Sequence, residues 1–318
     1  MGLARKILMD EAARRFSAAE KPCGIIASLD ADVVVDANFL DALKAHFAAT
    51  GCDGCSVYFE HPTGPATGAA DDPGSYPPEV YEAIMQYELH LRYYVHSVRS
   101  TGYPYATHTV GSCFAVRADV YCMEGGMNRR KGGEDFYFIQ KVAQRGHFSR
   151  CNSTRVVPSP RPSGRVPFGT GPAVRKYLKD RAAMTTFHPL SFRMLEKLFA
   201  DLDRLAGGID PERLTGDRPG VLRDFLLSQR FADAIGEIRE NSASGSAFRK
   251  RFWRWFHMFR ILKFLHYARD NGYPDMEVGE AARQFLALSG QHLIRVKKIP
   301  GDLPGLLELY RQIDREYC

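Results

Sequence analysis

Gly24-Ile25-Ile26-Ala27-Ser28-Leu29-Asp30-Ala31-Asp32 is the stretch of this sequence that predicts most about its fold. Four small or branched apolar residues run into two carboxylates two positions apart, which predicts a buried strand with both acids at its carboxyl end. Because alternate residues of a strand share a face, Asp30 and Asp32 are expected to point the same way, roughly 7 Å apart. Ligands of open parallel sheets bind at that end of the strands.

Two carboxylates at a strand end also predict a metal site. Mg²⁺ and Mn²⁺ take one or two protein carboxylates and keep other positions for water or a substrate phosphate, so Asp30 and Asp32 suit such an ion. The alternative is an acidic strand-to-helix turn, in which Asp36 caps a helix that begins near Asn38. A three-residue pattern is frequent by chance, so both interpretations stay open.

The segments on either side of this stretch predict helices. Residues 3–16 have an apolar face at helical spacing, and so have residues 39–50. The first face is Leu3, Ile7, Leu8, Ala12 and Phe16, and the second is Phe39, Leu40, Leu43 and Phe47. A helix, a strand and a helix in short succession predict a layered α/β domain.

Later segments extend this first domain, which we expect to cover residues 1–185. We expect further strands at residues 55–59, 107–117 and 155–157 and a helix at residues 79–100. Gly111 marks a close approach of the backbone. Residues 61–78 predict a long loop that either covers a substrate or has no role, and the Asp71-Asp72 pair in it is expected to be solvated. Residues 186–318 are helical in pattern and form a carboxyl-terminal extension.

The composition limits the classes of protein and partner. The chain of 318 residues is 45% apolar and 12% aromatic, and its net charge of +6 suits a nucleotide, a phosphorylated substrate or an anionic membrane surface. It has no apolar run long enough to span a membrane, and the residues after Met1 argue against a secretory signal. Seven cysteines predict free thiols in a reducing compartment, with Cys52 and Cys55 buried or in turns rather than forming a zinc or redox pair. We expect a cytoplasmic protein, and the inner face of the membrane is a candidate peripheral contact.

A second pair of acids lies in Lys131-Gly132-Gly133-Glu134-Asp135-Phe136, where two glycines let the backbone pass close to a ligand. Apolar residues continue from Phe136 at helical spacing, so both acids stand in the first turn of a helix, where the helix dipole favours them without any function. The functional alternative is that Asp135 accepts a proton from an attacking hydroxyl while Glu134 orients the acceptor or the metal site. The dipole lowers the pKa of Asp135 and the neighbouring carboxylate raises it, and the sequence does not say which effect is larger.

Two arginines lie in an irregular segment after the last predicted strand. Residues 158–171 are rich in proline and glycine, which excludes a regular element. Arg161 and Arg165 could close over a diphosphate with charge-assisted hydrogen bonds. The alternative is a linker with both arginines solvated.

The segment 248–269 has an apolar half and a basic half. It suits a basic helix lying on an anionic membrane. Trp253, Ile261 and Phe264 also occupy the basic half, which favours burial on two sides and packing against the first domain.

Four motifs follow one another along the chain: Gly24 to Asp32, Gly111-Ser112-Cys113-Phe114-Ala115-Val116-Arg117, Gly125-Gly126 and Gly133-Glu134-Asp135-Phe136. In this order and spacing they resemble the motifs of the family 2 glycosyltransferases of the GT-A fold. The resemblance covers roughly residues 1 to 170. It implies an α/β protein with a GT-A (Rossmann-like) mixed sheet and helices on both faces. The activity implied is a metal-dependent, inverting transfer of hexosyltransferase type.

The resemblance also implies roles for single residues. Asp30 would contact the ribose or the metal of a nucleotide-diphosphate sugar, and Asp32 would bind the divalent ion, Mn²⁺ or Mg²⁺, that bridges its diphosphate. Asp135 would be the catalytic base. Arg161 and Arg165 would form a flap over the donor. His188, just after that segment, would be an additional metal ligand, although a lone histidine before a proline is also an ordinary loop residue.

The chain departs from this family in its first residues. Members normally begin with a strand that carries a Pro and an Asn-Glu pair, whereas only 29 residues precede Asp30 here. We therefore expect a nucleotide-binding half that is incomplete at its amino terminus and leaves an open sheet edge, through a misplaced start or a split gene. An in-frame stop close upstream of Met1, with no strand-like coding region before it, would refute this hypothesis.

The sequence thus predicts a glycosyltransferase that moves a sugar from a nucleotide-diphosphate sugar to a hydroxyl of a saccharide or lipid-linked acceptor. Nucleic acid is not expected as a partner, and the oligomeric state is not predicted. The alternative is a non-catalytic remnant of the same fold that binds a glycan or a partner protein. A nucleotidyltransferase with similar carboxylates is a third hypothesis.

Overall fold

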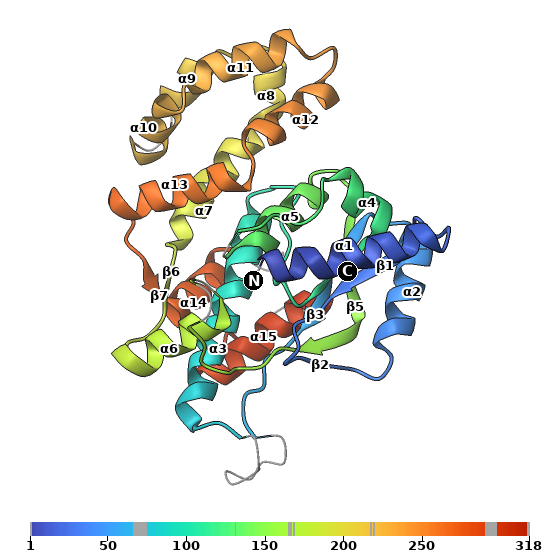
Figure 1. The fold of residues 1–318 in the computed structure, drawn as a ribbon. Helices are drawn as coiled ribbons and strands as arrows, with labels where there is room; N and C mark the ends of the chain where they lie inside the picture. The colour runs from blue at the N-terminus through green and yellow to red at the C-terminus, as the bar shows by residue number, and fades with distance from the viewer. Residues whose placement is uncertain are drawn as a thin grey trace. The chain divides into compact units, whose positions relative to one another are not determined.

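The computed structural model describes residues 2–65, 75–130, 132–164, 167, 169–216, 218, 220–289 and 298–316. The chain folds as two compact units, which Figure 1 colours along the sequence. Unit 1 comprises Met1–Arg92, Thr107–Met184 and Leu293–Cys318, and unit 2 comprises Tyr93–Ala106 and Thr185–His292. The carboxyl-terminal segment therefore belongs to the same unit as the predicted site residues near the amino terminus.

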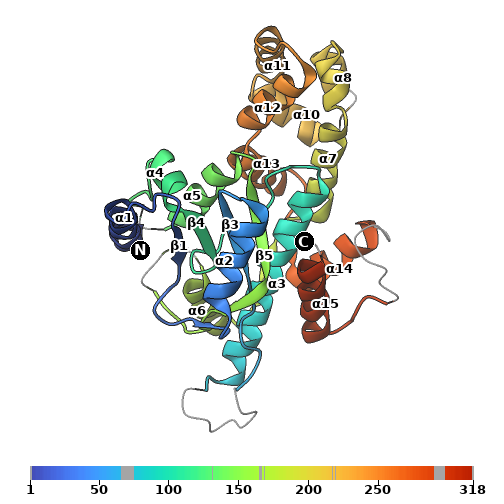
Figure 2. The same ribbon diagram turned by 90° about the vertical axis from the view of Figure 1, so that its right-hand side faces the viewer.

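A mixed sheet forms the centre of unit 1, as the sequence predicts (Figure 2). In the described part of the chain its strand order is β1 (Ile25–Ser28), β4 (Phe114–Arg117), β3 (Gly54–Phe59), β5 (Phe148–Val157) and β2 (Val34–Val35). β3 and β5 are parallel, and the other neighbouring strands are antiparallel. β1 lies at one edge of these strands.

Helices cover both faces of the sheet, which confirms the predicted layering. On one face, α1 (Gly2–Ala18), α4 (Ala118–Met123) and α5 (Glu134–Ala143) pack against apolar side chains of β1 and β4. On the other face, α2 (Phe39–Thr50) and α3 (Pro78–Ser100) contribute to a second apolar cluster with β3, β4 and β5. Since side chains alternate along a strand, Ile26 lies in the first cluster, and Ile25 and Ala27 pack against the second.

The predicted apolar face of α1 is mostly wrong. Leu3, Ile7 and Leu8 are 53%, 58% and 71% exposed, whereas Met9 and Ala13 are buried. α1 runs beside α4 (Figure 1) and approaches the backbone closely, since a methyl group at Gly2 would lie only 2.4 Å from the carbonyl oxygen of Arg130. Ala12 and Phe16 of the predicted face do pack against the cluster, together with Met9 and Ala13, while Leu3, Ile7 and Leu8 face solvent.

Two predicted strands have other bounds in the structure. The segment expected at 107–117 is a strand only from Phe114, with Gly111 in the turn before it, and the strand expected at 155–157 begins already at Phe148. Asp36 does not cap α2, because its carboxylate pairs with Arg155. Leu40, expected on the apolar face of that helix, is exposed.

Two further helices complete unit 1. α6 (Thr170–Asp180) follows the segment after β5 and packs against the first turns of α3 through Val174. α15 (Leu303–Glu316) is the last helix of the chain. It supplies two charged residues, Arg311 and Asp314, to a group of ion pairs inside the unit.

We call Glu88, Arg92, Arg311 and Asp314 the buried ion network. Arg92 is fully buried on α3 and pairs with Glu88 at 2.8 Å, with Asp314, and with the carbonyl oxygen of Phe59. The guanidinium of Arg311 also donates to Glu88, at 2.8 and 3.0 Å. Each of the two carboxylates is therefore paired with an arginine, and this pairing offsets the cost of removing the charge from water.

Two histidines extend the buried ion network. His61 Nδ1 lies 3.0 Å from Glu88, and His108 Nε2 lies 2.9 Å from Asp314. Burial alone would raise the pKa of Glu88, but Arg92, His61 and Arg311 hold it below its usual range. The network thus stays ionised and joins α3, α15 and the end of β3.

The described part of unit 2 is helical apart from two short strands, β6 (Thr185–Thr186) and β7 (Met276–Glu277), which pair with each other. Its helices are the end of α3, α7 (Pro189–Ala200), α8 (Leu202–Ala206), α9 (Pro211–Gly216), α10 (Gly220–Ser228), α11 (Phe231–Glu240), α12 (Gly245–Trp255), α13 (Met258–Asp270) and α14 (Val278–Ser289). Among the described residues, no helix combines the length and the apolar character that a bilayer crossing requires.

The segment 248–269 forms two helices rather than one, because α12 ends at Trp255 and α13 begins at Met258. Its aromatic and aliphatic side chains are buried on both sides, including Trp253, Ile261 and Phe264. Burial on two sides is confirmed, and the helices pack with α7, α8, α10 and α11 of the same unit.

Candidate functional site

Asp30 and Asp32 lie in a turn beyond the last residue of β1. The expected alternation along a strand does not apply to them, and their carboxylates have different partners. Asp30 pairs with Arg5 of α1 at 3.0 Å, and Asp32 pairs with Arg161 at 2.7 Å. The first pair is half-buried and the second is exposed, so the two acids lie in different electrostatic environments.

Arg5 is the residue that connects the two predicted acidic motifs. Its guanidinium binds Asp30, lies 3.5 Å from Glu134 of α5, and donates to the hydroxyl of Ser28 and the carbonyl oxygen of Gly111. The Arg5 side chain is only 10% exposed. Sequence reasoning missed this residue because it treated α1 only as a packing helix.

Asp135 completes this group, which we call the Arg5 cluster: Arg5, Asp30, Glu134 and Asp135. A methyl group at Gly111 would lie 2.7 Å from Asp135 Oδ2 and 2.8 Å from Arg5 Nη2, closer than van der Waals contact allows. The predicted close backbone approach at Gly111 is thus confirmed. It brings an acid of the second motif beside the arginine that holds the first.

The surroundings of Asp135 change its proton affinity. Removal from solvent and the neighbouring Glu134 carboxylate raise the pKa of Asp135, while the N–H of Phe136 and the Arg5 guanidinium lower it, and the net pKa is about 6. The sequence left open whether the dipole or the acid pair dominates. The net effect is upward, which puts Asp135 in the range where a carboxylate exchanges protons near neutral pH.

Two aromatic residues of α3 lie near the Arg5 cluster. Burial and the charge of Asp135 raise the pKa of Tyr87, so its hydroxyl keeps its proton. The ring of His90 stacks on Tyr87 with centroids 6.4 Å apart, and burial lowers the pKa of His90 to about 4. Both side chains therefore present neutral rings at pH 7.

A divalent ion was expected at Asp30 and Asp32. Among the described residues, no group of three potential metal-ligating side chains gathers at one point. Asp32 nevertheless suits an ion that takes one or two carboxylates and completes its shell with phosphate oxygens and water, because its side chain is 43% exposed. Asp30 suits it less well, since one of its oxygens already binds Arg5. The donor set thus fits a metal brought with a phosphorylated ligand better than a metal held by protein alone.

The remaining predicted site residues are placed differently. Arg161 lies beside Asp32 in an irregular segment, as expected, and Arg165 lies outside the described residues, as does the Asp71-Asp72 pair. His188 belongs to unit 2, where its Nδ1 accepts a hydrogen bond from the N–H of Leu190 and caps α7. Its role as a metal ligand stays a prediction.

The Cys52 and Cys55 pair is buried, as the sequence predicts. A hydrogen bond with the Cys55 thiol lowers the pKa of Cys52 to about 5, while the pKa of Cys55 is raised by the same bond and by burial. Both side chains lie in the apolar cluster of α2 and β3. The described cysteines are all free thiols.

Comparison of the chain with models of protein families, with curated proteins and with solved structures gave no match.

Proposed function

We propose that unit 1 is the catalytic unit of a glycosyltransferase of family 2 type with a GT-A fold. One observation carries the proposal: acids from two motifs about a hundred residues apart gather around Arg5, beside a backbone position without a side chain. A mixed sheet with helices on both faces is also the architecture expected for this class. The donor would be a nucleotide-diphosphate sugar, and the acceptor a saccharide or lipid-linked hydroxyl.

Asp135 is the proposed base. Above pH 6 it is ionised and can take the proton of an acceptor hydroxyl as the oxygen attacks the anomeric carbon. Arg5 lies beside this carboxylate, and the absent side chain of Gly111 lets the backbone pack closely against both groups. Glu134 would orient the acceptor or the metal site. The attack from the face opposite the leaving diphosphate inverts the anomeric centre.

Asp32 and Asp30 are the proposed ligands of Mn²⁺ or Mg²⁺. When bound, this ion would neutralise charge on the leaving diphosphate. Arg161 pairs with Asp32 and is itself exposed, so its guanidinium can turn to a phosphate oxygen of the donor. Arg165 has the same proposed role. The proposed location is the cytoplasm, with peripheral contact at the inner face of the membrane.

Calorimetry with UDP- and GDP-sugars, with and without Mn²⁺, tests the nucleotide half of the proposal. We expect binding that depends on Mn²⁺ and is lost in Asp32→Ala. Arg155→Met is the matched control, because it breaks another exposed ion pair of unit 1 and should bind normally. Binding that is absent, or equal with and without Mn²⁺, would contradict the proposal.

The chemical half is tested by Asp135→Asn. Sugar transfer should fall about 10²–10⁴-fold, the contribution of a positioned base, while Mn²⁺-dependent nucleotide binding persists. Transfer at the wild-type rate in this variant would exclude Asp135 as the base.

A second candidate is the non-catalytic remnant that binds a glycan or a partner protein. It is favoured by the arginine partners of both Asp30 and Asp32, which occupy the carboxylates that a metal would need. This candidate predicts no Mn²⁺-dependent nucleotide binding in the calorimetry.

A further inference from the structure

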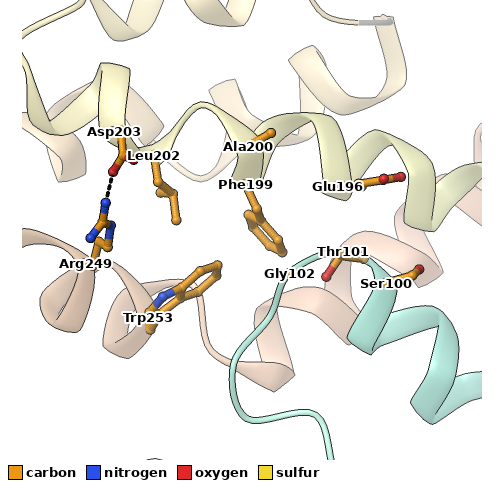
Figure 3. Close-up of a pocket in the computed structure, with 10 residues that line it drawn as sticks. All are labelled: Ser100, Thr101, Gly102, Glu196, Phe199, Ala200, Leu202, Asp203, Arg249 and Trp253. Carbon is orange, nitrogen blue, oxygen red and sulfur yellow. Dashed lines mark hydrogen bonds and ion pairs between the residues drawn. The ribbon is translucent and has the colours of Figure 1, made fainter. Parts of the chain in front are cut away.

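Unit 2 contains a cavity of about 440 Å³ between the end of α3, the helices α7 and α8, and α12 (Figure 3). This volume lies within the roughly 300–1,000 Å³ of small-molecule sites. Phe199 and Trp253 point toward each other and touch edge to face at its wall, with ring centroids 4.9 Å apart, and Leu202 adds an aliphatic part of the lining. One side of the cavity is therefore apolar and partly aromatic.

The charged side chains at the cavity neutralise one another. Asp203 pairs with Arg249, and Glu196 pairs with Arg193 at 2.6 Å. A ligand with a net charge would find no unbalanced opposite charge among these groups. The cavity favours a neutral ligand for this reason.

Hydrogen-bonding groups of both kinds remain for such a ligand. The hydroxyl of Ser100 donates to the carbonyl oxygen of Ser97 at 2.8 Å, which leaves its oxygen as an acceptor. The Nε1–H of Trp253 has no acceptor among the described residues, and the carboxylate of Asp203 and the guanidinium of Arg249 are more than half exposed. Donors and acceptors thus stand around an aromatic wall.

We propose that this cavity is a saccharide-binding site. A pyranose ring offers an apolar patch of C–H groups to the Trp253 and Phe199 wall, and neutral hydroxyls that both donate and accept to the polar rim. The site lies in unit 2 and uses none of the residues proposed for sugar transfer. Its occupancy is measured without any transferase activity, so failure of the proposed reaction leaves this inference standing.

The tryptophans of the chain give a direct readout. Trp253 and Trp255 are the only two, so Trp255→Phe leaves Trp253 as the single fluorophore. We expect at least one of maltose, cellobiose, lactose and diacetylchitobiose to change its emission saturably, with a Kd of about 1 mM or tighter. Choline and inorganic phosphate should give Kd values at least tenfold higher. No response to any of the four sugars, or an equal response to choline or phosphate, would overturn the proposal.

Two exposed residues of α7 supply a matched pair of variants. Ala200 lines the cavity and Lys197 does not, so Ala200→Phe narrows the opening while Lys197→Phe adds the same ring elsewhere on the helix. In the Trp255→Phe background, Ala200→Phe should raise the Kd of the responding sugar at least tenfold and Lys197→Phe less than twofold. Equal affinities in the two variants would place the sugar outside this cavity and contradict the assignment.

Discussion

The Arg5 cluster and the buried ion network are both made of arginine and carboxylate side chains of unit 1, but they balance charge differently. In the network, Arg92 and Arg311 face Glu88 and Asp314, so the charges match. In the Arg5 cluster, a single arginine pairs with both Asp30 and Glu134, and a third carboxylate, that of Asp135, lies beside it. The network therefore stabilises the fold, whereas the cluster holds excess negative charge that a ligand or a proton can compensate.

The largest effect is expected from breaking the network. Arg92→Met leaves Glu88 and Asp314 buried with too little positive charge, and should lower the free energy of unfolding by about 3–5 kcal/mol. Urea denaturation measures it. Arg155→Met breaks an exposed pair with Asp36 and a half-buried one with Glu60, which keeps Arg315 as a partner, and should cost below about 1 kcal/mol. Similar losses in both variants would remove the distinction between the buried network and pairs nearer the surface.

The next effect concerns the excess charge of the Arg5 cluster. Because the pKa of Asp135 is about 6 in the folded chain and near 3.8 ordinarily, folding favours its protonated form, and stability falls as pH rises from about 4 to 6. Asp135→Asn removes this dependence and should be more stable than wild type by about 2–3 kcal/mol above pH 6. Denaturation at pH 4 and pH 7 measures the difference. The exposed Asp180→Asn should show none, and a pH-independent gain in Asp135→Asn would refute the explanation.

A smaller effect is expected from Arg5 itself. Arg5→Met leaves the buried Glu134 carboxylate without this partner and should cost about 1–3 kcal/mol. The same substitution in a Glu134→Gln background should cost less, with a coupling energy above about 0.5 kcal/mol in a double-mutant cycle. Additive losses would show that Arg5 acts on stability through other contacts.

The smallest effect is expected at the exposed end of the site. Asp32→Ala breaks a pair in which both side chains are more than 40% exposed, so stability should change by less than about 1 kcal/mol. Thermal unfolding without metal measures it. A larger loss of stability would mean that the Asp32 ion pair stabilises the turn after β1, as the buried ion network stabilises the fold.

Local patterns predicted the elements that position the site. The apolar run before Asp30, the helical spacing after Asp135 and the close approach at Gly111 correspond to β1, α5 and the turn before β4. These features depend on neighbouring residues, whose periodicity and size are visible in the sequence.

The partners of these residues were not predictable in the same way. The apolar residues of α1 would allow either of two helix faces to be buried. The face that contains the small residues Gly2 and Ala13 is the buried one, and this orientation turns Arg5 inward. The network joins Glu88 to Arg311, 223 positions later, and nothing local to either residue signals the other. Such pairings are set by tertiary packing.

The order of unit 1 along the chain bears on its synthesis. Arg311 and Asp314 of α15 leave the ribosome after every residue of unit 2. Until then, Glu88 and Arg92 lack two of their buried partners. The buried ion network of unit 1 can therefore form only after all of unit 2 has been synthesised.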